Sequence, residues 1–191
     1  MQAIIDFDDV LIDLHSAFLR YAHDNLDIIM DVRKHTSFGF YQQYGISDSD
    51  FLGMIQTPEF TALIRPFASS CIALERLHDQ DVTINIVTSR GYMLDGYNKT
   101  LAQIQQFKFH CDKLIIVPDG KKKSECFNQI GSRIDLFVDD GFHNIVDAHK
   151  SGIVENIYLV DRPWNQIQQI EGKTVHRVSS LLDAICHFEK R

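Results

Sequence analysis

One stretch near the N-terminus constrains the fold of this chain more than any other, the residues Ala3 to Leu11 with the sequence AIIDFDDVL. A short apolar run, β-branched at Ile4 and Ile5, ends in acidic residues and then becomes apolar again. Buried parallel strands read as apolar runs of this kind, and open α/β sheets carry their chemistry just beyond the carboxyl ends of the strands. The stretch therefore predicts a buried parallel strand with carboxylates at its C-terminal end.

Asp6 and Asp8 are separated by one residue, so both side chains can lean toward the same site where the strand gives way to a loop. Two close carboxylates repel each other unless a cation lies between them, and oxygen ligands suit a hard divalent metal. The pair therefore favours a metal-dependent catalytic site. Acid pairs also occur as ordinary loop residues or helix caps, which is the alternative reading.

Three further segments show the same pattern of a strand followed by polar residues. They are Thr88 and Ser89 after residues 84–87, Lys121 to Lys123 after residues 113–117, and Asp139 and Asp140 after residues 136–138. The order of acid pair, hydroxyl, lysine and acid pair resembles the four motifs of the haloacid dehalogenase superfamily of phosphohydrolases. Each motif alone is weak, whereas four in order form a specific signal that spans Asp6 to Asp140.

Strands and helices alternate along most of the chain. Strands are expected at 2–7, 82–88, 113–117, 135–139, 155–160 and 174–178, and helices at about 92–109, 122–131, 142–151, 164–171 and 179–190. Such a βαβ series predicts an α/β fold, a doubly wound parallel sheet with helices on both faces.

The exception is the stretch 13–68, which carries apolar residues at helical spacing and no clear alternating strands. A structureless connection of this length is improbable in a compact domain, so a small helical insert is expected, with helix starts at Ser47 and Pro58. The catalytic core would then comprise residues 1–12 and 69–191. In the resembled superfamily an insert at this point is a cap over the active site; the alternative is a few helices packed on the sheet edge.

The composition excludes several classes of protein. The net charge of −7 argues against binding of a nucleic-acid polymer, and no apolar stretch approaches the roughly 20 residues that span a bilayer. The first residues enter a strand without the features of a signal peptide. The four cysteines form no Cys-x-x-Cys pair, as is typical of reduced thiols. We expect a cytoplasmic protein, monomeric or homodimeric, that acts on a small molecule and binds no membrane.

The resemblance implies a role for each motif residue. Asp6 would attack phosphorus and form an aspartyl-phosphate, and Asp8 would protonate the leaving oxygen and later deprotonate water. Thr88, or Ser89 as the alternative, would donate a hydrogen bond to the phosphate. Arg90 would contact the phosphate or the insert, or would be a surface cation.

The resemblance also implies a lysine and a Mg²⁺ site. Lys123, directly before a helix start, matches the motif best and would bridge the phosphate and Asp6, with Lys121 and Lys122 left as alternatives. Asp6, the backbone carbonyl of Asp8, and Asp140 would bind Mg²⁺. Asp139 would lie in the outer shell or orient the lysine. Asp9 stands where glycine is commonest in the motif.

Within the superfamily the chain is most similar to the cytosolic 5'(3')-deoxyribonucleotidases and their bacterial and phage homologues. The local similarities are VTS at 87–89, FVDD at 137–140 and LVDRPWN at 159–165. They imply a Mg²⁺-dependent phosphomonoesterase for nucleoside monophosphates. Aromatic residues of the insert would then stack on the base, or would simply form the core of the insert; they are Phe38, Phe40, Tyr41 and Tyr44.

Other functions remain alternatives. The ester could be another small one, such as a sugar phosphate. A receiver-type signalling module also uses an acid pair, a threonine and a lysine, but it needs a strand-end aspartate between the acid pair and the threonine. No such residue stands between Asp9 and Thr88. A non-catalytic relative is the third alternative.

Overall fold

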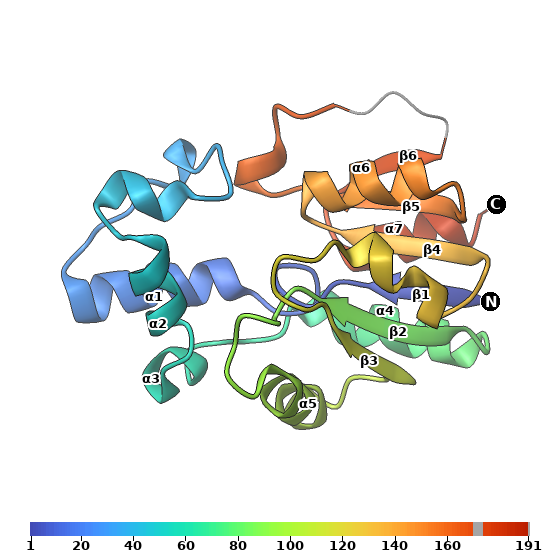
Figure 1. Ribbon diagram of the computed structural model, residues 1–191, viewed down its shortest axis with the longest axis horizontal. Coiled ribbons are helices and arrows are strands. Elements are labelled where there is room, and N and C mark those ends of the chain that lie inside the picture. Colours follow the sequence, from blue (N-terminus) through green and yellow to red (C-terminus); the bar gives the residue numbers. More distant parts are fainter. Residues whose placement is uncertain (170–173, 191) are drawn as a thin grey trace.

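A computed structural model describes residues 1–169 and 174–190 of the chain and contains one sheet of six parallel strands (Figure 1). The spatial order is β3-β2-β1-β4-β5-β6, with the first strand inside the sheet. The strands are β1 (Gln2–Ile5), β2 (Thr83–Thr88), β3 (Lys113–Ile116), β4 (Ile134–Asp139), β5 (Val154–Val160) and β6 (Val175–Val178). The predicted doubly wound α/β fold is confirmed.

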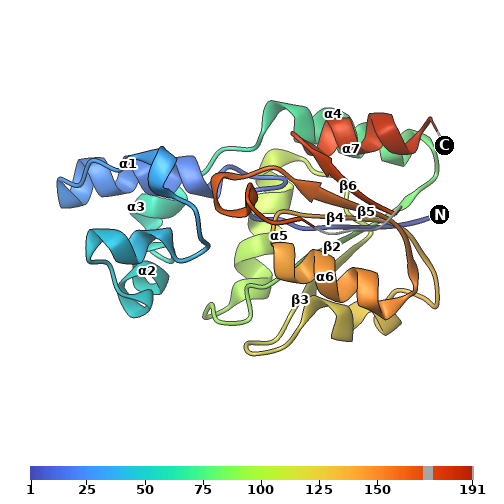
Figure 2. The ribbon, with the colours of Figure 1, turned by 90° about the horizontal axis from the view of Figure 1, so that it is seen from above.

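Helices cover both faces of the sheet, so its central strands are apolar on both sides. Figure 2 shows α4 (Ala68–Asp79) and α7 (Leu181–Phe188) on one face and α6 (Phe142–Ser151) on the other. The alternation of β1 fits this arrangement, because Ala3 and Ile5 belong to one apolar cluster and Ile4 belongs to the other. Helix α5 (Gly96–Phe107) packs against β3.

The register of the strands brings their polar ends together. Ile5 at the end of β1 lies beside Ile86 of β2 on one side and Val138 of β4 on the other. The residues that follow in each strand, Asp6 and Asp139 among them, therefore leave the sheet at the same edge.

The insert lies beyond this edge, at the left of Figure 1. It contains α1 (Leu14–Leu26), α2 (Asp48–Met54), α3 (Pro58–Thr61) and the 3-10 helices η1 (Val32–Lys34) and η2 (Phe40–Tyr44). The predicted helix starts are confirmed: the Ser47 side chain caps α2, and Pro58 occupies the first turn of α3. The chain enters and leaves the insert through paired segments, with the Asp13 amide donating to the Arg65 carbonyl at 2.9 Å.

Three predicted helices were wrong in extent or type. The helix expected at about 92–109 begins only at Gly96, since Asp95 adopts a left-handed conformation with φ of 58°. The segment expected at 122–131 is the 3-10 helix η3 (Lys123–Gln129). The helix expected at 164–171 is, within the described residues, the 3-10 helix η4 (Pro163–Asn165), and residues 170–171 lie outside them.

A side chain explains the early end of η4. Arg177 of β6 donates to the carbonyls of Asn165 and Gln168, at 2.9 and 2.6 Å. These carbonyls are therefore satisfied by a guanidinium, and the backbone gains little by continuing as a helix. In the part of the chain that the structure describes, no helix is long and apolar enough to cross a membrane. All four cysteines are free.

Candidate active site

Three buried carboxylates meet where β1 and β4 end. Oxygen atoms of Asp6, Asp139 and Asp140 all lie within 4.8 Å of one another. Asp6 directly follows β1, and Asp139 is the last residue of β4, the neighbouring strand. The parallel pairing of two adjacent strands is thus sufficient to assemble the cluster.

One lysine lies inside this cluster. The Nζ of Lys123 lies 2.6 Å from Asp6 and 2.7 Å from Asp139, and its side chain is 2% exposed. Burial works to lower the pKa of Lys123, but the charges of Asp139 and Asp6 outweigh burial, so this pKa lies above its ordinary value and the ammonium stays charged. Lys121 and Lys122 pair instead with Glu125 and Asp147 near the surface.

Both oxygens of Asp139 are already occupied by protein donors. One accepts from Lys123, and the other accepts from the Gly141 amide at 2.7 Å and from Asn144 Nδ2 at 3.1 Å. A Cβ at Gly141 would lie 2.9 Å from the same carboxylate oxygen, so the close approach suits glycine. Asp139 is therefore fixed beside the lysine and is less free than Asp6 or Asp140 to bind a further ligand.

The remaining carboxylates are destabilised in the absence of a further cation. Burial, reinforced by neighbouring carboxylates, raises the pKa of Asp6 well above its ordinary value and raises that of Asp140 to about 8. If all three carboxylates are ionised, they leave an excess of two negative charges over the one ammonium of Lys123. An all-oxygen set with this charge fits a divalent cation such as Mg²⁺, which Asp6 and Asp140 would hold.

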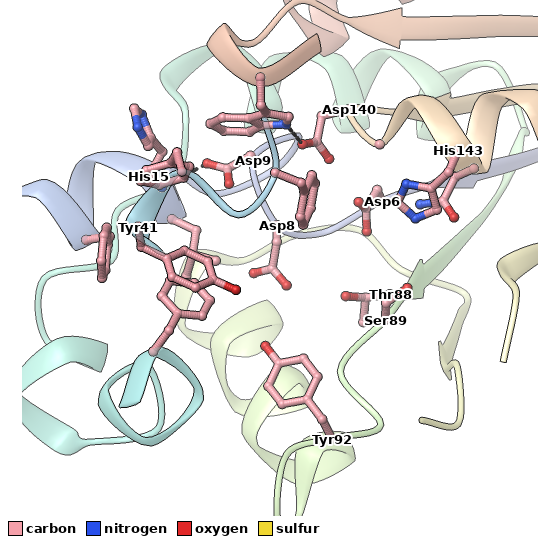
Figure 3. A pocket seen from close by; sticks show the side chains of 18 of the residues that line it. Asp6, Asp8, Asp9, His15, Tyr41, Thr88, Ser89, Tyr92, Asp140 and His143 are labelled. Carbon is pink, nitrogen blue, oxygen red and sulfur yellow. Dashed lines mark hydrogen bonds between the residues drawn. The ribbon is translucent and has the colours of Figure 1, made fainter. Parts of the chain in front are cut away.

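Thr88 ends β2 beside this cluster, and its hydroxyl lacks a partner. Its Oγ1 is the one buried side-chain polar atom of the described residues without a hydrogen bond. A buried hydroxyl without a partner is costly, and this one lines the cavity that contains Asp6 and Lys123. Ser89, the next residue, lines the same cavity but is exposed. Figure 3 shows Asp6, Asp8 and Thr88 around one common space.

Asp8 is held by Arg90. The guanidinium Nη2 lies 2.5 Å from Asp8 Oδ1, and Nε lies 2.9 Å from Oδ2, which makes a bidentate pair. Arg90 is 2% exposed, stacks on the Phe7 ring and donates to Gln103 Oε1 at 2.7 Å. Arg90 is therefore a buried anchor for Asp8, and it does not line the cavity.

Asp9 turns the chain out of the site. Its φ is 56°, in the left-handed region, which glycine adopts freely and aspartate tolerates better than most residues. Its carboxylate accepts from the His15 amide at 2.9 Å, and Arg162 Nε donates to its carbonyl at 2.8 Å. Burial raises the pKa of the Asp9 carboxyl to about 8.

A cavity of about 380 Å³ extends from the carboxylates to the insert. Of the aromatic residues singled out from the sequence, Phe38, Phe40 and Tyr41 line this cavity. Tyr44 does not, because its hydroxyl accepts from the Asp31 amide at 2.9 Å inside the insert. Phe40 is buried against His35, whereas Phe38 is 62% exposed.

Sequence reasoning missed several residues that line the cavity. Trp164 donates from Nε1 to Asp140 Oδ2 at 2.9 Å, and Tyr92 and His143 also line the cavity (Figure 3). In the sequence, the segment at 159–165 stands out only for its resemblance to a segment of the nucleotidases. Its tryptophan could have been proposed as a partner of a strand-end acid, because β5 lies beside β4.

Comparison with known proteins gives a consistent result for the fold. No family model matches the chain, and no curated protein sequence does. A solved structure of a predicted phosphatase from Clostridium acetobutylicum has a TM-score of 0.69 at 14% identity, covering 100% of this chain and 98% of that chain. An HAD phosphatase from Thermococcus onnurineus has a TM-score of 0.60 at 12% identity, covering 96% and 95%.

A third structure carries ligands of direct interest. It is a D,D-heptose 1,7-bisphosphate phosphatase from B. bronchiseptica complexed with magnesium and phosphate, with a TM-score of 0.58 at 13% identity, covering 99% of this chain and 98% of that chain. At these identities the likeness shows a shared fold. The chain therefore has the fold of the haloacid dehalogenase phosphatases, with a buried acid cluster at the carboxyl end of its sheet.

Proposed function

We propose that the protein is a Mg²⁺-dependent phosphomonoesterase that transfers the phosphoryl group of a small ester first to Asp6 and then to water. The observation that carries the proposal is the buried ion pair of Lys123 with Asp6 and Asp139, next to the unpartnered hydroxyl of Thr88. A phosphate bound between them would accept hydrogen bonds from Lys123 and Thr88, which would satisfy the threonine.

The residues divide into a metal-binding set and a phosphate-binding set. Asp6, the Asp8 carbonyl and Asp140 would hold Mg²⁺. Asp139 accepts a hydrogen bond from Lys123 and so fixes the position of the ammonium. When bound, the ion would offset the repulsion between the substrate phosphate and the carboxylates. Thr88 and Lys123 would bind the phosphate oxygens, with Ser89 at the exposed side.

The first step forms a bond between a carboxylate oxygen of Asp6 and phosphorus, and it breaks the bond between phosphorus and the ester oxygen. Asp8 donates a proton to the departing oxygen, which leaves as an alcohol. In the second step Asp8 takes a proton from water, whose oxygen displaces Asp6 and releases inorganic phosphate.

The pairing of Asp8 with Arg90 limits which Asp8 oxygen can exchange a proton in these steps. Both Asp8 oxygens accept hydrogen bonds from Arg90. We propose that one oxygen rotates toward the substrate while the other keeps its bond to the guanidinium. Arg90 would thus act as a positioning residue.

For the substrate we propose nucleoside monophosphates, with a sugar phosphate as the second candidate. The exposed Phe38 ring and the Tyr41 ring line the cavity at the insert, and aromatic faces stack on bases. The heptose 1,7-bisphosphate phosphatase with this fold favours the second candidate. The four free cysteines suit the cytoplasmic location that we propose.

The test is release of inorganic phosphate from a panel of monoesters, with Mg²⁺ and with EDTA. We expect release from at least one nucleoside monophosphate with Mg²⁺ and none with EDTA. The Asp6→Asn variant should be inactive. Release that is unaffected by EDTA, or retained by Asp6→Asn, would contradict the proposal.

A further inference from the structure

The cavity is lined by many more acidic than basic side chains. Among the described lining residues Lys123 is the only lysine or arginine. Five aspartates face the same space: Asp6, Asp8, Asp9, Asp48 and Asp140. The cavity therefore has little positive charge with which to bind anions.

The positive charge that exists is already committed. Lys123 lies between Asp6 and Asp139, and Arg90, outside the cavity lining, is paired with Asp8. With the Mg²⁺ of the proposed function, the charges of the ion and Lys123 equal those of Asp6, Asp139 and Asp140. These groups can hold one phosphate, and the described residues of the cavity lining offer no further lysine or arginine for a second anion.

The insert side of the cavity is aromatic, with one carboxylate. Tyr41 stacks on Phe51 with ring centres 4.2 Å apart and planes nearly parallel. The Tyr41 hydroxyl donates to Asp48 Oδ1 at 3.0 Å, and Gln42 Nε2 donates to the same oxygen at 2.8 Å. These two bonds, from Gln42 first and then Tyr41, lower the pKa of Asp48, so this carboxylate is charged at neutral pH.

We infer that Asp48 is a specificity-determining residue that restricts the protein to phosphate monoesters with an uncharged, flat leaving group. The inference rests on the proposed function and narrows it. An ester with a second phosphate or a carboxylate would bring a second anion toward Asp48, where like charges repel and no uncommitted lysine or arginine of the described cavity lining compensates. The aromatic rings offer a flat leaving group a surface on which to stack. This protein would then differ in substrate from the heptose 1,7-bisphosphate phosphatase that shares its fold.

The test compares two esters that differ in one charge, phenyl phosphate and 4-carboxyphenyl phosphate. The wild-type protein with Mg²⁺ should show kcat/KM about three- to fivefold higher for phenyl phosphate, because Asp48 is exposed and water screens the repulsion of a like charge. Asp48→Asn keeps an acceptor oxygen for Tyr41 and Gln42, and it should reduce this ratio to about one. Asp48→Lys should reverse the preference.

The matched control is Glu59→Gln, which removes one negative charge from an exposed position of the insert outside the cavity lining. It should leave the ratio at the wild-type value. Equal turnover of both esters by the wild-type protein would overturn the inference, and so would an unchanged ratio in both Asp48 variants. Failure to hydrolyse either ester, or any monoester of the panel, would count against the proposed function instead.

Discussion

Arg90 donates hydrogen bonds to both carboxylate oxygens of Asp8, with nitrogen–oxygen distances of 2.5 and 2.9 Å. The two residues are 82 positions apart in the chain, and each lies two or three residues beyond the end of a buried strand. The arginine is buried and is itself held by Thr100 and Gln103. A bidentate pair of this kind fixes the orientation of a carboxylate more strictly than a single hydrogen bond does.

Replacement of the guanidinium by an ammonium should therefore impair the acid–base steps. We expect Arg90→Lys to lower kcat by roughly ten to a hundredfold, because general acid–base catalysis contributes roughly 10²–10⁴-fold. Lysine keeps the positive charge but cannot form the bidentate pair with the Asp8 carboxylate. The double variant Asp8→Asn, Arg90→Lys should be no slower than Asp8→Asn alone. Fully additive losses would mean that Arg90 acts elsewhere. A thermal melt of each variant controls for loss of the fold.

Asp6→Asn should separate catalysis from stability. Turnover should fall below detection, because an amide does not attack phosphorus as a carboxylate does. The melting temperature of the metal-free variant should equal or exceed that of the wild type, since a buried carboxylate with a raised pKa is removed. The exposed Asp24→Asn is the control, with wild-type turnover. A large drop in melting temperature would show that Asp6 contributes more to the fold than its charge costs.

The metal-free protein should lose stability as the pH rises toward about 8. The folded-state pKa values of Asp9 and Asp140 are about 8, against 3.8 for ordinary carboxyls. The folded state thus binds more protons between these values, and the free energy of unfolding falls with increasing pH up to about 8. His15, with a pKa lowered to about 4 by burial, acts in the opposite direction only below its ordinary 6.5.

Melting temperatures between about pH 6.5 and 8.5 isolate the carboxylates from His15. Without metal the melting temperature should decline across this range. Added Mg²⁺ should restore it, and the gain should increase with pH because proton and metal compete for Asp140. A gain from Mg²⁺ that is constant with pH would argue against direct ligation by this carboxylate.

Phe38 is the insert aromatic that we expect to contact a substrate. It is 62% exposed although it lines the cavity, and it contacts the core edge-on at His143, with ring centres 6.0 Å apart. Phe38→Ala should lower the preference for nucleoside monophosphates over p-nitrophenyl phosphate about tenfold, since stacking contributes roughly 1–3 kcal/mol per base. Tyr44→Phe, outside the cavity, should leave the preference unchanged. The measurement is the ratio of the two kcat/KM values for each variant.

The sheet could be predicted because its signals are local. Apolar runs that end in acids mark buried parallel strands, and parallel pairing of β1 with β4 is enough to bring Asp6 near Asp140. The partner of Arg90 and the contact of Trp164 with Asp140 depend on side-chain directions across two elements, which no spacing in the chain encodes. The early end of η4 could not be predicted for the same reason, since it depends on a hydrogen bond from Arg177 on a later strand.

The attachment of the insert has a consequence for how such chains can change. Leu11 and Ile12 on the way out pair with Phe67 and Pro66 on the way back, so the two ends of the insert meet in a short two-stranded clasp. The sheet is thus connected directly to the clasp, and the residues between the two halves of the clasp form one closed loop. The entropy of closing a loop grows only slowly with its length. A chain of this architecture can therefore lengthen, shorten or exchange the segment between the clasp residues while the register of β1 on β2 stays as it is.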